Sequence, residues 1–120
     1  MREDGRVGYQ KLVVWQKADE LAFAVYQAAK GFPRDERYGM TSQLRRAALS
    51  VPTNLVEGAS RQGKKEFKQF VNVALGSAAE VGYLLGFCTR LGYLTESSYQ
   101  GLEAQRKEVG RLLWNLHRSL

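Results

Sequence analysis

The 120-residue sequence has little of the chemistry that most enzymes and metalloproteins need. It contains one cysteine, Cys88, and one histidine, His117. A single chain therefore cannot form a disulfide framework or a histidine metal cluster. Only two prolines occur, and no segment is rich enough in proline and serine to be a linker. We expect a protein that is not an enzyme and that has no cofactor or metal.

The start of the chain also lacks the pattern of a secretory signal. Residues 1–8 are polar and mixed in charge, whereas a signal peptide needs an apolar central run. A single cysteine fits a reducing compartment, so we expect a cytoplasmic location. The remaining composition, 44% apolar and 25% charged, is typical of one globular domain. We expect a short polar segment at 1–10 and one domain at 11–120.

One segment has the spacing of a nucleotide-binding loop but not its chemistry. The run from Gly58 to Lys65 matches G-x-x-x-x-G-K, yet Lys65 replaces the hydroxyl residue that would hold magnesium. It also joins two predicted helices, whereas a P-loop follows a strand. We therefore reject nucleotide hydrolysis. A basic helix start here would still attract phosphate, or be no more than a solvated helix end.

Apolar residues recur at helical spacing in four stretches, and no strand pattern is convincing. The first covers about 12–30, and the second runs from a cap at Thr41 or Ser42 to about residue 59. The third follows Gly63 and stops at Gly92, a suitable C-terminal glycine, and the fourth follows a Thr95 cap. This pattern predicts an all-α fold, an antiparallel up-down four-helix bundle.

The second helical stretch contains Pro52 in its interior. Proline has no N–H to donate to the carbonyl of Ala48 and its ring crowds that carbonyl, which costs roughly 3 kcal/mol. Short polar side chains at Ser50, Thr53 and Asn54 can bond to the freed backbone groups. We therefore predict a proline-kinked second helix that serves shape and not chemistry.

The second and third stretches are more apolar than a single bundle needs. In the third, Glu80 is the only charged residue between 73 and 89. A membrane span is disfavoured because the run is short and contains polar residues and glycines. We therefore predict a homo-oligomer, in which the polar residues of the second stretch form a hydrogen-bonded seam between subunits; the alternative is that they face solvent. The predicted interface residues are Leu49, Pro52, Asn54, Val56, Glu57, Gly82, Tyr83 and Phe87.

The net charge of +6 is unevenly distributed. Residues 34–68 carry eight basic and four acidic side chains, and residues 106–120 carry four and one. Such segments favour a polyanionic partner, RNA or DNA, or else form a solvated surface. Arg106 falls on the apolar line of the fourth stretch, and we expect it to extend out of the core. The candidate nucleic-acid-binding residues are Arg45, Arg46, Arg61, Lys64, Lys65, Lys68, Arg106, Lys107 and Arg111.

Three strings in the chain resemble a known family. They are Glu36-Arg37-Tyr38-Gly39, Gln43-Leu44-Arg45-Arg46-Ala47 and Ser50-Val51-Pro52-x-Asn54-x-x-Glu57-Gly58, and a weaker match continues through Ser77, Glu80 and Leu91-Gly92-Tyr93-Leu94. Together they are similar to the four-helix-bundle family of 23S rRNA intervening-sequence proteins.

The resemblance implies a cytosolic bacterial homopentamer with no catalytic residues. The family is distantly similar to the accessory variability determinant of diversity-generating retroelements, which engages nucleic acid and a reverse transcriptase. The motif residues of the 23S rRNA intervening-sequence protein family look structural, since they shape the second helix against the third or against a neighbouring chain. The resemblance therefore favours a nucleic-acid-binding oligomer, and the alternative is a scaffold that recruits a protein partner without touching nucleic acid.

Overall fold

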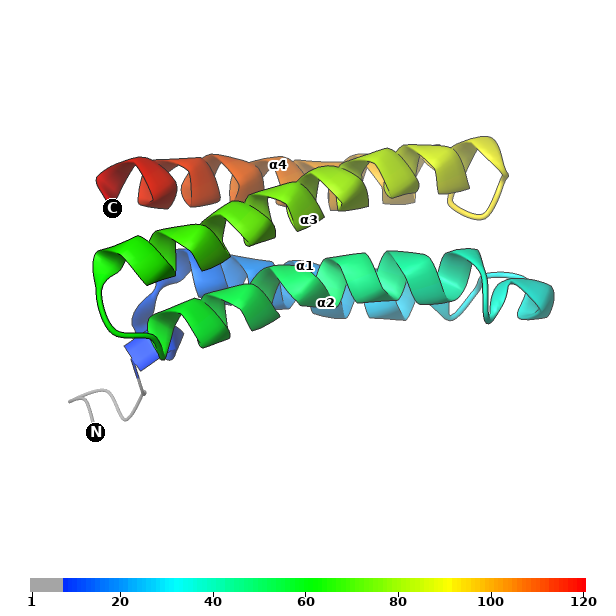
Figure 1. Cartoon of the computed structure of the whole chain (residues 1–120). Helices are drawn as coiled ribbons and strands as arrows, with labels where there is room; N and C mark the ends of the chain where they lie inside the picture. The colour runs from blue at the N-terminus through cyan, green and yellow to red at the C-terminus, as the bar shows by residue number, and fades with distance from the viewer. Residues whose placement is uncertain (1–7) are drawn as a thin grey trace.

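The computed structural model describes residues 8–120 (Figure 1). Among these residues there is no strand, so the all-α helical bundle is confirmed. Two short 3-10 turns, η1 and η2, precede the first and second long helices. The elements are η1 (Gly8–Lys11), α1 (Val13–Ala29), η2 (Arg34–Glu36), α2 (Met40–Ala59), α3 (Lys64–Arg90) and α4 (Glu96–Ser119).

The four helices pack around one core. α1 and α3 each contact both α2 and α4, while within residues 8–120 α2 does not approach α4. α2 and α4 therefore lie diagonally across the bundle. The largest side chains that are fully buried come from all four helices: Leu21, Leu44, Leu55, Leu85 and Leu113. Burial of each such leucine contributes on the order of 1.5–3 kcal/mol.

By length and composition alone, α3 is apolar enough to cross a membrane. It packs against α2 and α4, however, and it buries Val71, Ala74, Ala78, Val81 and Leu85 in the core, which accounts for part of its apolar character. Only 33% of its most apolar window is buried inside the chain. α3 is therefore a core helix that also carries apolar side chains outside the core of this chain.

The C-terminal end of α3 and the N-terminal end of α4 form as the sequence predicts. The N–H of Ser98 donates to Thr95 Oγ1 at 3.1 Å, which caps α4. At the end of α3, Gly92 has φ +80, and its N–H donates to the Thr89 carbonyl at 3.0 Å. The next N–H, of Tyr93, donates to the Cys88 carbonyl at 2.9 Å. This pair of bonds is a Schellman motif, which explains the glycine.

The predicted cap of α2 is wrong, because Thr41 and Ser42 lie inside the helix. The N–H of Met40 instead donates to Glu36 Oε1 at 3.1 Å, and Glu36 Oε2 accepts the Tyr93 hydroxyl at 2.6 Å. The α1–α2 and α3–α4 connections lie at the same end of the bundle, which allows this bond (Figure 1). The Tyr93 bond lowers the pKa of Glu36, and the carboxylate raises the pKa of Tyr93 to about 12.

α2 continues through Pro52. Thr53 Oγ1 donates to the Leu49 carbonyl at 2.8 Å, and Asn54 Nδ2 donates to the Ser50 carbonyl at 2.8 Å. Both side chains therefore bond to backbone carbonyls in the turn that precedes the proline. The Ser50 hydroxyl hydrogen-bonds that of Ser77 at 2.8 Å and so joins α2 to α3. The kink itself stays a prediction.

Candidate nucleic-acid interface

The predicted basic residues form three separate groups. Arg45 and Arg46 lie in the first half of α2, and a second group surrounds the α2–α3 connection. From Arg46 to the end of α2 at Ala59 the helix rises roughly 20 Å, and Arg61 lies beyond that end. The third group lies on α4, diagonally opposite α2. The structure therefore does not assemble all nine residues into one surface.

The group on α2 belongs to a larger basic surface, here called the arginine face. Two grooves of about 650 and 660 Å³ adjoin there and share Arg37, Thr41 and Arg45. No carboxylate lines either groove within the described part of the chain. The cations that line them are Lys30, Arg34, Arg37, Arg45 and Arg46. Such a concentration of one sign of charge attracts anions.

Packing against α1 holds Arg45 in place. Its Nη2 donates to the carbonyl of Tyr26 at 3.1 Å, and its guanidinium carbon lies 5.0 Å from the centre of the Tyr26 ring. Its Nε has no acceptor among residues 8–120. A guanidinium fixed in this way loses little conformational entropy when it binds a phosphate.

Tyr38 is the most exposed aromatic of this surface, with 87% of its area accessible. The Arg37 guanidinium lies 5.2 Å from its ring centre. Neither Arg34 nor Arg37 was among the predicted site residues, although both fall in the segment with the largest charge surplus.

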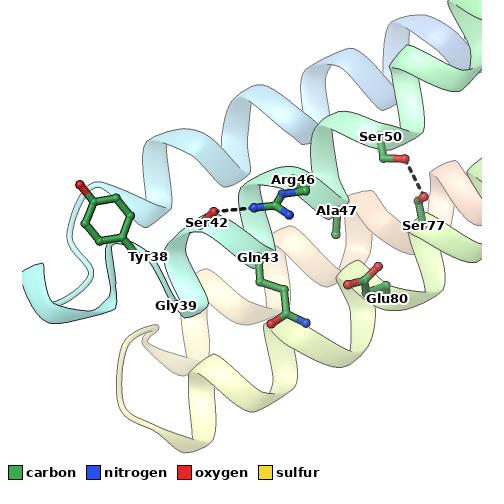
Figure 2. A pocket seen from close by; sticks show the side chains of 9 residues that line it. All are labelled: Tyr38, Gly39, Ser42, Gln43, Arg46, Ala47, Ser50, Ser77 and Glu80. Carbon is green, nitrogen blue, oxygen red and sulfur yellow. Dashed lines mark hydrogen bonds between the residues drawn. The ribbon is translucent and has the colours of Figure 1, made fainter.

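A third groove, of about 570 Å³, runs between α2 and α3 (Figure 2). Arg46 lines it and donates through Nη2 to Ser42 Oγ at 3.1 Å. Glu80 of α3 lines the same groove and is its only carboxylate among the described residues. This groove is therefore mixed in charge and less suited to a polyanion than the arginine face.

The group at the α2–α3 connection consists mostly of exposed side chains. Lys64 and Lys65 are exposed, Lys68 is half-buried, and Arg61 lies over the Phe70 ring at 5.0 Å. The connection joins two helices, as predicted, so the P-loop spacing has no strand before it. These cations lie close to Glu66 in the first turn of α3. They form a weaker anion surface than the arginine face.

Arg106 of the α4 group is half-buried and does not belong to the hydrophobic core. It forms a two-bond ion pair with Glu103, Nε–Oε1 at 2.9 Å and Nη2–Oε2 at 2.6 Å, which the sequence pattern was not used to predict. These bonds raise the pKa of Arg106. A Cβ on Gly82 of α3 would lie 2.9 Å from Arg106 Nε, so a larger residue there would displace this arginine side chain. Arg106 is consequently the weakest of the nine candidates.

The predicted interface residues differ in exposure. In this single chain, Leu49 and Tyr83 are 48% and 66% exposed, and Glu57 is exposed. Val56, Phe87, Gly82 and Asn54 are half-buried, and Asn54 bonds to Ser50. Pro52 is buried inside its own chain, which argues against a contact with another copy. Val73 and Leu91, which were not among the predicted interface residues, add further exposed apolar area.

The fold and its surface define a four-helix protein, and residues 8–120 contain no group of side chains that could hold a metal ion. A model of the family described as 23S rRNA-intervening sequence protein matches residues 10–115. The chain therefore belongs to this family, as its motifs predicted.

A solved structure supports the same assignment. The chain is similar to a protein of unknown function from the S23 ribosomal protein family of Bacteroides thetaiotaomicron VPI-5482, whose crystal structure was determined at 1.70 Å. The TM-score is 0.82 at 26% sequence identity, over 88% of this chain and 96% of the other. No curated protein matches.

Proposed function

We propose that this protein is a non-enzymatic homo-oligomer that binds structured RNA or other nucleic acid through the arginine face. The observation that carries the proposal is the pair of adjoining grooves lined by five cations and no carboxylate among the described residues. Guanidinium groups bind phosphate oxygens through paired hydrogen bonds, and clustered cations release condensed counterions from a nucleic acid.

The charged groups of the arginine face favour contact with the phosphate backbone of RNA. The arginine face lies along the first half of α2, the end of α1 and the connection between them, and its charged groups bind phosphate oxygens well. Contacts would therefore go mainly to phosphates, with weak sequence preference and strong salt dependence. The family is named for sequences that interrupt 23S rRNA, which supports RNA as the polyanion.

The assembly part of the proposal rests on exposed apolar surface. Val73, Tyr83 and Leu91 are each at least 45% exposed in the single chain, on α3 and at its end. Leu49 of α2 is similarly exposed but lines a groove of the arginine face. A second copy would remove this area from water, and the resemblance implies five copies. A protein partner could cover the same area, which is the observation that favours the scaffold alternative.

The test compares two charge-reversal variants in binding titrations with a labelled RNA hairpin at low salt. Arg37→Glu with Arg46→Glu changes the arginine face while leaving the packed Arg45 in place. Lys64→Glu with Lys65→Glu makes the same change in net charge at the α2–α3 connection and serves as the control. We expect the first pair to weaken binding at least tenfold more than the second.

Two results would overturn parts of this proposal. Equal losses in the two variants would mean that net charge, and not the arginine face, attracts RNA. A wild-type protein that binds neither RNA nor DNA at low salt would leave the scaffold as the better function. Light scattering at micromolar concentration tests the assembly separately, and a monomer would contradict it.

A further inference from the structure

The outward side of α4 carries a second basic surface, separate from the arginine face. Lys107, Arg111, Trp114 and Arg118 follow one another at steps of four, three and four residues. At 100° per residue these positions fall within an arc of about 60° on the helix. All four side chains are exposed, and Trp114 is 52% exposed. They form one line along the helix, here called the α4 stripe.

No acidic partner neutralises the α4 stripe within the described residues. The two carboxylates nearest along the helix are otherwise engaged, since Glu103 pairs with Arg106 and Glu108 lies 4.0 Å from Lys17 of α1. The Arg118 guanidinium donates to the neutral Asn115 Oδ1 at 3.2 Å. The stripe therefore presents three positive charges to solvent.

The indole of Trp114 lies among these cations and not in the core. Its ring is nearly parallel to that of His117, with an interplanar angle of 7° and a centroid distance of 5.8 Å. Packing of the hydrophobic core does not account for the exposed indole of Trp114 between two arginines. An aromatic ring flanked by cations is, however, the arrangement with which proteins bind single-stranded nucleic acid, because bases stack on the ring while cations contact phosphates.

We propose that the α4 stripe binds an unpaired stretch of nucleic acid, with a base stacked on Trp114 and phosphates contacted by Lys107, Arg111 and Arg118. This inference rests on the proposed function and deepens it. From Lys107 to Arg118 the helix rises about 16 Å, a length that suits a short unpaired segment. Because α4 and α2 are diagonal, one chain would hold paired RNA on the arginine face and an unpaired segment on the stripe.

The test uses two RNA probes of equal length, a labelled 12-nucleotide oligouridine and a 12-base-pair duplex. Trp114→Ala should weaken oligouridine binding about 5- to 150-fold, since stacking contributes about 1–3 kcal/mol per base. Duplex binding should change less than twofold, and Trp114→Phe should keep most of the affinity for oligouridine. The matched control is Phe23→Ala on α1, which removes another aromatic side chain that is 66% exposed.

Fluorescence gives a second measurement that does not depend on the alanine variant. In a Trp15→Phe background Trp114 is the only tryptophan. Oligouridine should quench its emission, whereas heparin, which has charge but no bases, should not. Equal quenching by heparin would overturn base stacking. A blue shift of the emission with vesicles of anionic lipid, without quenching by oligouridine, would assign the stripe to a lipid surface instead.

The outcomes separate this inference from the proposed function. If the wild type binds the duplex and Trp114→Ala binds oligouridine as tightly as the wild type, only the α4 stripe proposal fails. If the wild type binds neither probe, the proposed function fails as well. A change in particle mass caused by Trp114→Ala would place the indole in a subunit interface and would overturn its assignment to RNA.

Discussion

A substitution at Gly58 gives the sharpest test of how closely α2 packs against α3. The residue closes the Ser50–Gly58 motif and lies near the end of α2, where it is buried. A Cβ added there would lie 2.8 Å from Phe67 Cδ1 and 2.8 Å from Phe70 Cβ. Real Cβ atoms do not approach other carbons so closely. The substitution Gly58→Ala therefore forces the start of α3 to move away from α2.

The magnitude follows from two opposing effects. Overpacking of one methyl group in a well-packed site costs about 1–3 kcal/mol. Alanine is the better helix former by about 1 kcal/mol, which offsets part of that cost. We expect Gly58→Ala to gain no stability, with a free energy of unfolding up to about 2 kcal/mol below that of the wild type.

The control is another glycine in a helix, Gly101 of α4, whose added Cβ would have no atom within 4 Å. Gly101→Ala should raise the free energy of unfolding by about 0.5–1 kcal/mol, because only the helix propensity changes. Urea unfolding of both variants at one protein concentration measures the two changes. If Gly58→Ala gains as much stability as Gly101→Ala, the close packing of α2 on Phe67 and Phe70 is refuted.

Three further predictions test other contacts. Ser50→Ala should cost about 1 kcal/mol, and Ser77→Ala in addition should cost little more, because the first change already removes the Ser50–Ser77 bond; additive costs in urea unfolding would contradict that bond. Tyr93→Phe should be less stable than the wild type at pH 7. The difference should shrink as acid protonates Glu36, because a lowered carboxylate pKa stabilises the fold above the ordinary value of 4.5 and loses that effect on acidification. If the stability difference between Tyr93→Phe and the wild type does not change with pH, the Glu36 carboxylate does not contribute to it. Cys88 should react with thiol reagents at pH 8 only after unfolding, since burial raises its pKa to about 11, and rapid labelling of the folded protein would contradict its burial.

Periodicity was sufficient to predict the helices because each one buries a continuous line of apolar residues. The four predicted stretches agree with the observed helices to within about two residues. Local capping chemistry predicted Thr95 and Gly92 correctly because each acts within a few residues of its own helix end. The cap of α2 was missed because Glu36 lies four residues before Met40 and is held in place by Tyr93 from a distant connection.

The candidate site was only partly predictable for the same reason. The charge surplus indicated Arg45 and Arg46, but the ring beneath Arg45 belongs to Tyr26, nineteen residues earlier on another helix. Sequence spacing also could not show that α2 and α4 are diagonal, so it grouped basic residues that the fold separates. The pairing of Arg106 with Glu103 is a local i,i+3 contact, and attention to the charge pattern of α4 would have found it.

The most direct test of RNA binding by the arginine face is the salt dependence of the affinity for a labelled RNA hairpin. For the wild type, the logarithm of the association constant should fall linearly with the logarithm of salt concentration, by about 0.9 per neutralised phosphate. The Arg37→Glu, Arg46→Glu variant should bind more weakly and with a slope smaller by about two. Identical slopes for the variant and the wild type, or no RNA binding at 50 mM salt, would contradict the account.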